Sequence, residues 1–370
     1  MDIEVDRRDL RRTRVVAGVR PALALGQVRL RVDVFALSSN NVSYAAFGDA
    51  LQYWEFFPAA PGDGDDCTWG RVPVWGYADV TESRCDDLAV GRRVYGYFPM
   101  SDELVVEPGR CDDGGFTDLA AHRAPMASSY NRYTFAEADP GYDPDREHHR
   151  IALFPLFFTS FLIDDFVGDN DCFGATIAVV SSASSKTAIG AARQLSNREG
   201  LQVIGLTSKS NRAFVAGLGC YDTVVEYGDV AALPDGIAIY VDIAGNADVR
   251  AAVHERYAGD LVHSMIVGGT HWDHHSVAPA PTAGATPAFF FAPTQIAKRT
   301  KEWGREGMEA RLGGAWDAYS RWADTWVHFD TRLGSSGIEQ TWRELVAASI
   351  DPTAGYICRP ADELPNSSFR

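Results

Sequence analysis

Lysine is scarce in this sequence: the 34 basic residues include lysine only at positions 186, 209, 298 and 301. Acidic residues are more numerous, at 50, so the formal net charge is -16. Such an excess of negative charge repels nucleic acid and anionic membrane surfaces. We therefore expect a soluble protein with small-molecule or protein partners: a small-molecule substrate, a possible homodimer, and no nucleic-acid or membrane partner.

Clustered cysteines and long apolar runs are also missing. The six cysteines, at positions 67, 85, 111, 172, 220 and 358, form no C-x-x-C pair and no short metal-ligand spacing. The N-terminal MDIEVDRRDLRR lacks the apolar core of a secretory signal. The most apolar run, Ile151–Ile163, covers about half of a bilayer and contains Pro155. We expect a cytoplasmic protein with reduced thiols.

The chain itself is long and of ordinary composition. Its 370 residues, 46% hydrophobic and 23% charged, suit two or three globular domains. The first 110 residues are β-rich, because Val28–Leu37 alternates apolar and polar residues like a half-buried antiparallel strand. Shorter strands are expected at 72–80, 93–99 and 103–107. The segment 111–150 is polar and aperiodic, which predicts a loop.

From residue 175 the pattern changes to buried strands that alternate with helices of about ten residues, as in a parallel, doubly wound sheet. The expected strands are IAVVSS, LQVIGLT, DTVVEY, AIYVDIAG and LVHSMIVGG, and the expected helices span 187–198, 211–218 and 247–257. A helical stretch is then predicted up to about Phe329, because large apolar residues recur three or four apart.

The first turn of this parallel unit is a candidate phosphate-binding loop. Ser184, Ser185, Lys186 and Thr187 stand at the expected helix N-terminus, where small residues let the backbone approach a pyrophosphate. A P-loop would need glycine at positions 180 and 185, and a G-x-G-x-x-G fingerprint is also missing. A serine-rich turn that binds nothing therefore stays open as an alternative.

The second turn points to the kind of nucleotide. Thr207 is followed by Ser208, Lys209 and Arg212, whereas sheets that bind NAD carry an acidic residue here for the ribose hydroxyls. Hydroxyl, ammonium and guanidinium groups instead suit a 2′-phosphate. The sequence predicts NADP as cofactor; a solvated helix start is the alternative.

These residues resemble a known family. Residues 28–269 are similar to the medium-chain dehydrogenase/reductase superfamily, in its zinc-independent quinone and enoyl reductase branch. The matching stretches are VFALSSNNVSYAAFG, WGYADVTESRCDDLAVGRRVYGYFP, IAVVSSASSKTAIGAARQL, VIGLTSKSNRAFVAGLGCYDTVVEY and VDIAGNADVR. The resemblance implies that Ser208, Arg212 and Tyr227 hold the 2′-phosphate.

The resemblance also implies the architecture: an α/β fold with a Rossmann-type parallel, doubly wound sheet and a β-rich, GroES-like catalytic domain. We expect the β-rich domain at 1–150 and 335–370, because AGYICRP at 354–360 looks like the family's closing strand. The dinucleotide-binding domain is expected at 151–334, with a helical insertion near 290–330. Gly268 and Gly269, which end the last parallel strand, join the candidate cofactor-binding residues.

No metal is expected. Where the zinc-containing branch of the superfamily has Gly-His-Glu, this sequence has Gly76-Tyr77-Ala78, and it has no cysteine cluster. His271, His274 and His275 follow the fifth parallel strand, so a metal site or a contact with substrate stays open there beside the simpler reading of a polar loop.

Candidate catalytic residues follow the first long strand. Asn41 and Tyr44 resemble the family positions that face the nicotinamide, where a phenol or amide can stabilise the developing oxyanion. The alternatives are turn chemistry for Asn41 and packing for Tyr44. Tyr53 is a third candidate; with Trp54, Phe56, Phe57 and Trp75 it could line a substrate pocket or belong to the core.

The sequence thus predicts an NADPH-dependent, zinc-independent oxidoreductase that transfers hydride to an α,β-unsaturated carbonyl, a quinone or a similar electrophile. Two alternatives remain: an NADP-dependent carbonyl or alcohol dehydrogenase, and an NADPH-binding sensor without turnover.

Overall fold

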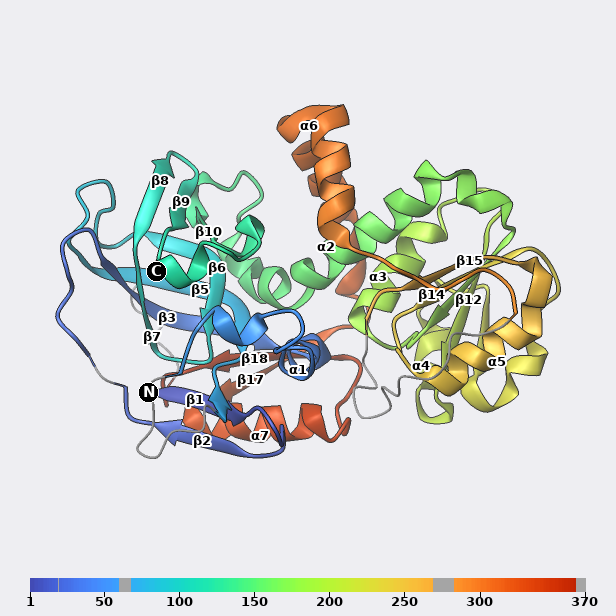
Figure 1. The fold of residues 1–370 in the computed structure, drawn as a ribbon, viewed down its shortest axis with the longest axis horizontal. Helices are drawn as coiled ribbons and strands as arrows, with labels where there is room; N and C mark the ends of the chain where they lie inside the picture. The colour runs from blue at the N-terminus through green and yellow to red at the C-terminus, as the bar shows by residue number, and fades with distance from the viewer. Residues whose placement is uncertain (19, 60–67, 269–282, 364–370) are drawn as a thin grey trace. The chain divides into compact units, whose positions relative to one another are not determined.

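A computed structural model describes residues 1–18, 20–59, 68–268 and 283–363 (Figure 1). The chain divides into unit 1, Met1–Ala152 with His328–Arg370, and unit 2, Leu153–Val327. The second boundary differs from the expected 334/335, because β17 (His328–Leu333) pairs with β18 (Ala354–Arg359) in the sheet of unit 1.

Unit 1 is built around a nine-stranded sheet. Its other strands are β3 (Val28–Leu37), β5 (Pro73–Ser83), β6 (Arg93–Pro99), β7 (Glu103–Val106), β8 (Pro108–Asp112), β9 (Gly115–Asp118) and β10 (Arg132–Phe135). The order is β17-β18-β3-β5-β6-β10-β9-β8, with β7 also on β3. β1 (Asp2–Asp6), β2 (Thr13–Val16) and β4 (Trp69–Gly70) form a second, small sheet.

The long strand β3 is more buried than its alternation suggested. Arg29, on its nominally polar face, is 2% exposed and donates to Glu82, Glu103 and the carbonyl of Pro21. β5 pairs with one edge of it and β7 with part of the other, and Arg31 is the one exposed residue along its length. A strand can therefore carry buried charge when partners on neighbouring strands satisfy it.

The prediction of a loop for 111–150 was wrong. The segment contains the end of β8, then β9, β10, four short 3₁₀ turns and the start of α2 (Glu147–Asp169). The strands β9 and β10 have four residues each and pair with one another; β10 also pairs with β6, and β9 with β8. Strands this short depend on pairing partners elsewhere in the chain, so they show no local alternation of apolar and polar residues from which they could be predicted.

Unit 2 contains the parallel sheet, which confirms the predicted fold class. Its strands are β11 (Ile177–Ser181), β12 (Gln202–Thr207), β13 (Thr223–Glu226), β14 (Ala238–Asp242), β15 (Leu261–Ile266) and β16 (Ala288–Phe289). They are all parallel and ordered β13-β12-β11-β14-β15-β16. Helices α3 (Lys186–Leu195) and α5 (Ala247–Tyr257) lie on opposite faces, and α4 (Arg212–Gly217) joins β12 to β13 (Figure 1).

The apolar run around Ile151–Ile163 forms α2, a helix that periodicity did not predict. By length and composition it is, within the described residues, the one helix that could cross a membrane, yet 56% of its most apolar window is buried. No side chain along Glu147–Asp169 is exposed. A helix that is apolar on all sides and covered on all sides is typical of a protein core.

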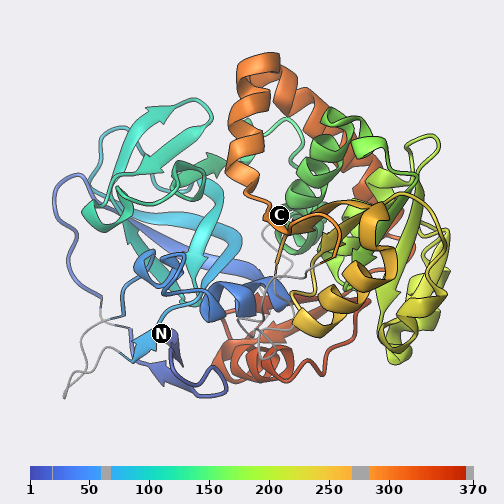
Figure 2. The same cartoon turned by 45° about the vertical axis from the view of Figure 1, so that its right-hand side comes forward.

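The predicted helical insertion is α6 (Ala292–Ala323), which ends before Phe329 because that residue belongs to β17. Gly304 interrupts it with φ 70° and ψ 170°, and Figure 2 shows the two parts running in different directions. The first part is held on α2, where Arg299 pairs with Asp165 at 2.7 Å and with Asp169 at 3.0 Å.

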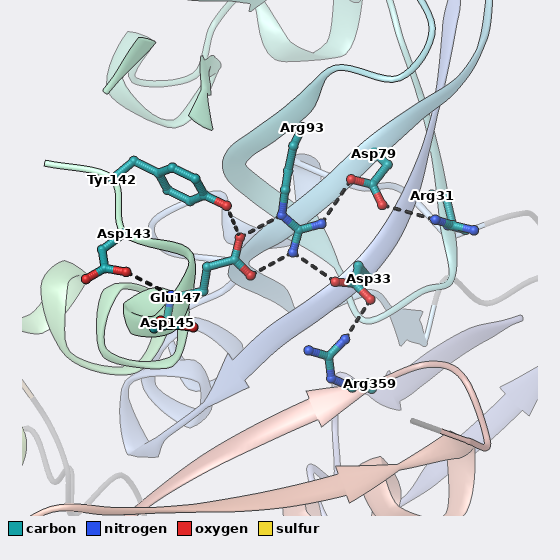
Figure 3. A network of polar contacts seen from close by, with 9 residues as sticks. All are labelled: Arg31, Asp33, Asp79, Arg93, Tyr142, Asp143, Asp145, Glu147 and Arg359. Atoms are coloured by element: carbon teal, nitrogen blue, oxygen red, sulfur yellow. Dashed lines mark hydrogen bonds and ion pairs between the residues drawn. The ribbon is translucent and has the colours of Figure 1, made fainter. Parts of the chain in front are cut away.

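The remaining helices of unit 1 are α1 (Ser39–Ala46) and α7 (Gly334–Val346). The α2 N-terminus is fixed by an ion-pair network around Arg93, on β6 (Figure 3). Arg93 donates two bonds to Glu147, at 2.6 and 2.7 Å, and one each to Asp33 and Asp79, at 2.9 Å. Burial lowers the pKa of Arg93, but Glu147 and the two aspartates raise it overall. These contacts join β3, β5, β6 and α2 into one unit.

Candidate cofactor and substrate sites

The turn between β11 and α3 stands at the carboxyl end of the parallel sheet, the edge where such sheets bind ligands. Ser182 has a left-handed backbone (φ 52°), and its N–H donates to the Tyr227 hydroxyl at 3.0 Å. Ser185 caps α3 by accepting the N–H of Ala188. A Cβ at Gly190 would lie 2.6 Å from the Ser160 hydroxyl, so this glycine lets α3 approach α2 closely. The turn is small, tight and followed by a helix N-terminus, as a pyrophosphate requires.

The predicted residues of the second turn lie beside the first one. Asn211 donates its amide to the Ser184 hydroxyl at 2.9 Å, which joins the two turns. Ser208 bonds with Ser210 at 2.9 Å, and Lys209 is exposed. The structure thus brings Ser184 and the 208–212 segment together at one end of the sheet.

Sequence reasoning missed Glu226 in this region. It ends β13 opposite Thr207, and its carboxylate lies 3.8 Å from the Arg212 guanidinium. The two side chains are 33% and 59% exposed, so the pair is weak. No acidic residue directly follows Thr207 in the sequence, but Glu226 lies beside it on the neighbouring strand. Only the pairing of β12 with β13 brings these two positions together.

Tyr227 and the two glycines complete the predicted set. Tyr227 contacts the first turn through Ser182, and burial raises its pKa to about 12, so its hydroxyl stays protonated at neutral pH. The N–H of Gly268 lies 3.4 Å from the carbonyl of Asp242. Gly269 lies outside the described residues.

The buried carboxylate of Asp242, at the end of β14, is a second group that was not predicted from the sequence. It is fully buried and accepts from the Ser181 hydroxyl (3.0 Å), the Gly245 N–H (2.9 Å) and the Arg250 guanidinium (2.8 Å). The Ser181 oxygen in turn accepts the N–H groups of residues 243 and 244, both at 3.0 Å. Asp242 therefore locks the end of β11 to the turn after β14.

Asn41 is held inside unit 1. Its Oδ1 accepts the Ser38 N–H at 2.8 Å and its amide donates to the Pro73 carbonyl at 2.9 Å, and the residue is 4% exposed. The side chain thereby completes the cap at the N-terminus of α1 and connects the helix to β5 by a hydrogen bond.

We expect Asn41→Ala to lower the free energy of unfolding by about 1–3 kcal/mol, because Ser38 and Pro73 each lose a buried partner. Urea denaturation of the purified variant measures this. Ser39→Ala, on the same helix, serves as control. A variant of unchanged stability that loses turnover would instead assign Asn41 to the reaction.

Tyr44 lies in an aromatic cluster of unit 1. The buried members are Tyr44, Phe56, Phe57 and Tyr97, and the partly buried ones that pack on them include Tyr53, Trp75 and Tyr130. Burial raises the pKa of Tyr44 far above its ordinary value, and neighbouring phenols modify the shift. Trp54 packs away from this cluster, against Gly48, Gly70 and the Arg7 guanidinium. Of the predicted aromatic group, Phe56 and Phe57 are core, while Tyr53 and Trp75 keep an accessible side.

The part of the chain that the structure describes holds no group of three or more His, Cys, Asp or Glu side chains placed to bind a metal ion. His271, His274 and His275 lie outside that part.

Comparison with solved structures identifies the fold. CurA from Vibrio vulnificus in complex with NADPH superposes with a TM-score of 0.60 at 12% identity, covering 95% of each chain. YhdH of Escherichia coli K-12 with bound NADPH gives 0.56 at 13%, covering 97% of this chain and 100% of the other. The quinone oxidoreductase from Coxiella burnetii gives 0.52 at 13%, covering 97% and 98%. The chain therefore shares the fold of these solved proteins, an α/β fold with a parallel sheet, as predicted from the sequence.

Within that fold, the chain belongs to the family described as protein of unknown function (DUF2855), whose family model matches residues 35–351. No curated protein matches the sequence.

Proposed function

We propose that the protein is an NADPH-dependent oxidoreductase that transfers hydride to an α,β-unsaturated carbonyl, a quinone or a similar electrophile. The observation that carries the proposal is the hydrogen bond of Asn211 to Ser184, which joins the turn that contains Ser208, Lys209 and Arg212 to the turn before α3. Backbone N–H groups at a helix start suit a pyrophosphate, and the hydroxyl and cationic groups suit a 2′-phosphate. The solved relatives that contain NADPH support the same assignment.

Each group has a role in this proposal. NADPH, when bound, supplies the hydride. The 182–187 turn would hold the pyrophosphate, with Tyr227 keeping the strained Ser182 in place. Tyr44 would donate a hydrogen bond to the oxygen of the substrate, because burial raises its pKa and keeps the phenol protonated. No metal is part of the proposed reaction.

We expect NADPH to bind more tightly than NADH. Each charge-assisted bond to the 2′-phosphate contributes about 1.5–3 kcal/mol, or roughly 10- to 150-fold in affinity. Arg212→Gln should therefore weaken NADPH and leave NADH unchanged, as measured by isothermal titration calorimetry with both cofactors.

Glu226→Gln is the matched control for this site. It removes the carboxylate that pairs with Arg212, so it should tighten NADPH moderately and again leave NADH alone. Equal affinities of the wild-type protein for the two cofactors would contradict the proposal.

One observation favours a second candidate, an NADPH-binding protein without turnover: Asn41 uses both ends of its amide within unit 1. Assays with a panel of enones, quinones and aldehydes, in which oxidation is measured as loss of NADPH absorbance, distinguish the enzyme from the NADPH-binding protein. Tight NADPH binding with no oxidation by any acceptor would select the second candidate.

A further inference from the structure

Arg250, in the first turns of α5, has its side chain at the carboxyl end of the parallel sheet. Its Nε donates to the Asp242 carboxylate at 2.8 Å, and the two side chains are 18% and 0% exposed. Asp242 in turn accepts the Ser181 hydroxyl at 3.0 Å. One buried carboxylate therefore connects Arg250 to the last residue of β11, directly before the turn that leads into α3.

The strand order puts this carboxylate where parallel sheets bind ligands. From β11 the chain continues outward to β12 and β13, and it then returns to β14, on the other side of β11. Ligands of such sheets bind outside the carboxyl ends of the strands at this reversal. Ser181 and Asp242 are the last residues of the two strands that flank it, so Arg250 is held at the border of the ligand region.

The Asp242 carboxylate leaves most of the Arg250 guanidinium unused. Its Oδ1 accepts from the Ser181 hydroxyl, from the Tyr240 hydroxyl at 3.2 Å and from the Gly245 N–H at 2.9 Å. Its Oδ2 accepts from Nε of Arg250. Among the described residues, no acceptor is hydrogen-bonded to either Nη group of Arg250. Both Nη groups therefore remain as donors on a guanidinium whose position is fixed.

Other partly buried arginines of the protein use their Nη groups. Arg93 donates from Nε and both Nη atoms to three carboxylates, and Arg198 donates from Nε and Nη2 to Asp164. Their side chains are 23% and 28% exposed, so both are more accessible to water than Arg250. A largely buried guanidinium with two unused Nη groups suits an anion with paired oxygens, as in a phosphate.

The other polar groups at the start of α5 do not offer this chemistry. Asn246 caps the helix by accepting two N–H groups of the first turn, and Asp248 is exposed. His254, one turn after Arg250, has both ring nitrogens in hydrogen bonds of 2.9 Å, and burial lowers its pKa. His254 is therefore uncharged at neutral pH, and Arg250 supplies the positive charge at this end of the helix.

We propose that Arg250 binds a phosphate group of the dinucleotide, with Asp242 holding its Nε and both Nη groups donating to the phosphate oxygens. The inference rests on the proposed function for its ligand and adds a binding residue that neither turn contains. NADPH has two groups of this chemistry, the 5′-diphosphate and the 2′-phosphate. Ser181 leads into the turn assigned to the first, and Tyr227, whose pKa is raised by burial and further by Asp242, is assigned to the second.

Calorimetry of the full-length protein with simple nucleotides tests this contact. ADP carries the 5′-diphosphate, 2′-AMP carries the 2′-phosphate, and adenosine is the uncharged reference. Arg250→Gln should weaken ADP or 2′-AMP by about 10- to 150-fold, the range of a charge-assisted hydrogen bond, and leave adenosine unchanged. The nucleotide that is affected identifies the phosphate.

Arg256→Gln is the matched control, because it removes the same charge from the far end of the same helix. Arg256 pairs with Asp235 at 2.7 Å, away from the carboxyl ends of the strands. This variant should leave the affinities for ADP, 2′-AMP and adenosine unchanged.

Unchanged affinity of Arg250→Gln for both ADP and 2′-AMP would overturn the proposal, as would a wild-type protein that binds neither. An equal loss for adenosine would also overturn it, since Arg250 would then only support the fold. If the glutamine variant does not fold, Arg250→Lys keeps a cation beside Asp242 without the paired Nη donors, and should weaken the same nucleotide. Failure of the proposed function looks different: ADP binding would depend on Arg250, while NADPH is neither preferred to NADH nor oxidised.

Discussion

Replacing Tyr44 by phenylalanine should lower the turnover number by about 10²–10³, the usual contribution of a proton donor or oxyanion partner. The change removes only the hydroxyl and keeps the ring that packs against Tyr53 and Tyr97. NADPH affinity and melting temperature should hardly change. Steady-state oxidation of NADPH with an accepted enone or quinone, beside calorimetry with NADPH, measures both quantities.

The aromatic cluster offers the controls for this prediction. Tyr53→Phe removes a hydroxyl from a ring that packs against Tyr44, and Tyr77→Phe removes one from outside the cluster. If Tyr44 only fills space, all three variants should turn over like the parent protein. That result would remove Tyr44 from the mechanism and make Tyr53 and Tyr97 the next donors to test.

Asp242→Ala should destabilise unit 2 by about 3–5 kcal/mol, because it leaves a half-buried guanidinium and several buried donors without their acceptor. The affected donors are Arg250, the Ser181 hydroxyl and the Gly245 N–H. NADPH affinity should fall as well, since the same network fixes the end of β11 from which the phosphate turn begins. Denaturation in guanidinium chloride, with and without NADPH, measures both effects.

Asp235→Ala is the matched comparison. Asp235 also pairs with an arginine, Arg256 at 2.7 Å, but is 96% exposed, and such surface pairs contribute about 0–1 kcal/mol. A loss below about 1 kcal/mol in Asp242→Ala would show that the buried network adapts to its removal.

Elements of both units whose signals are local could be predicted well. Strand β3 and helix α5 begin and end at the predicted residues, since alternation and a capping Asn246 mark them in the sequence. The missed elements are of another kind. β9 and β10 are short strands that only pairing stabilises, and α2 is apolar on every side, so neither period stands out.

Among the candidate site residues, too, those with a local sequence signal were predicted and those that depend on distant contacts were not. A turn between a strand and a helix is visible in sequence, and the residues 184–187 and 208–212 were found there. Contacts between distant segments were not: Glu226 beside Arg212, Asp242 beside Ser181, and Tyr130 against Tyr97. For Asn41 the position was found but its contacts were not. The resemblance to a family position did not indicate that its amide is hydrogen-bonded at both ends, to Ser38 and to Pro73.

The strand order of unit 1 has a consequence for how the chain acquires its structure. β18 pairs with the Phe35–Leu37 end of β3, so the last strand of the described residues pairs with one that is synthesised about 320 residues earlier. Unit 2 is a single continuous stretch between them, with strands that are neighbours in sequence or nearly so. Contacts between distant segments form slowly, and during synthesis that end of β3 stays an open edge that can pair with other chains. Unit 2 therefore has the opportunity to fold on the ribosome before the sheet of unit 1 is complete.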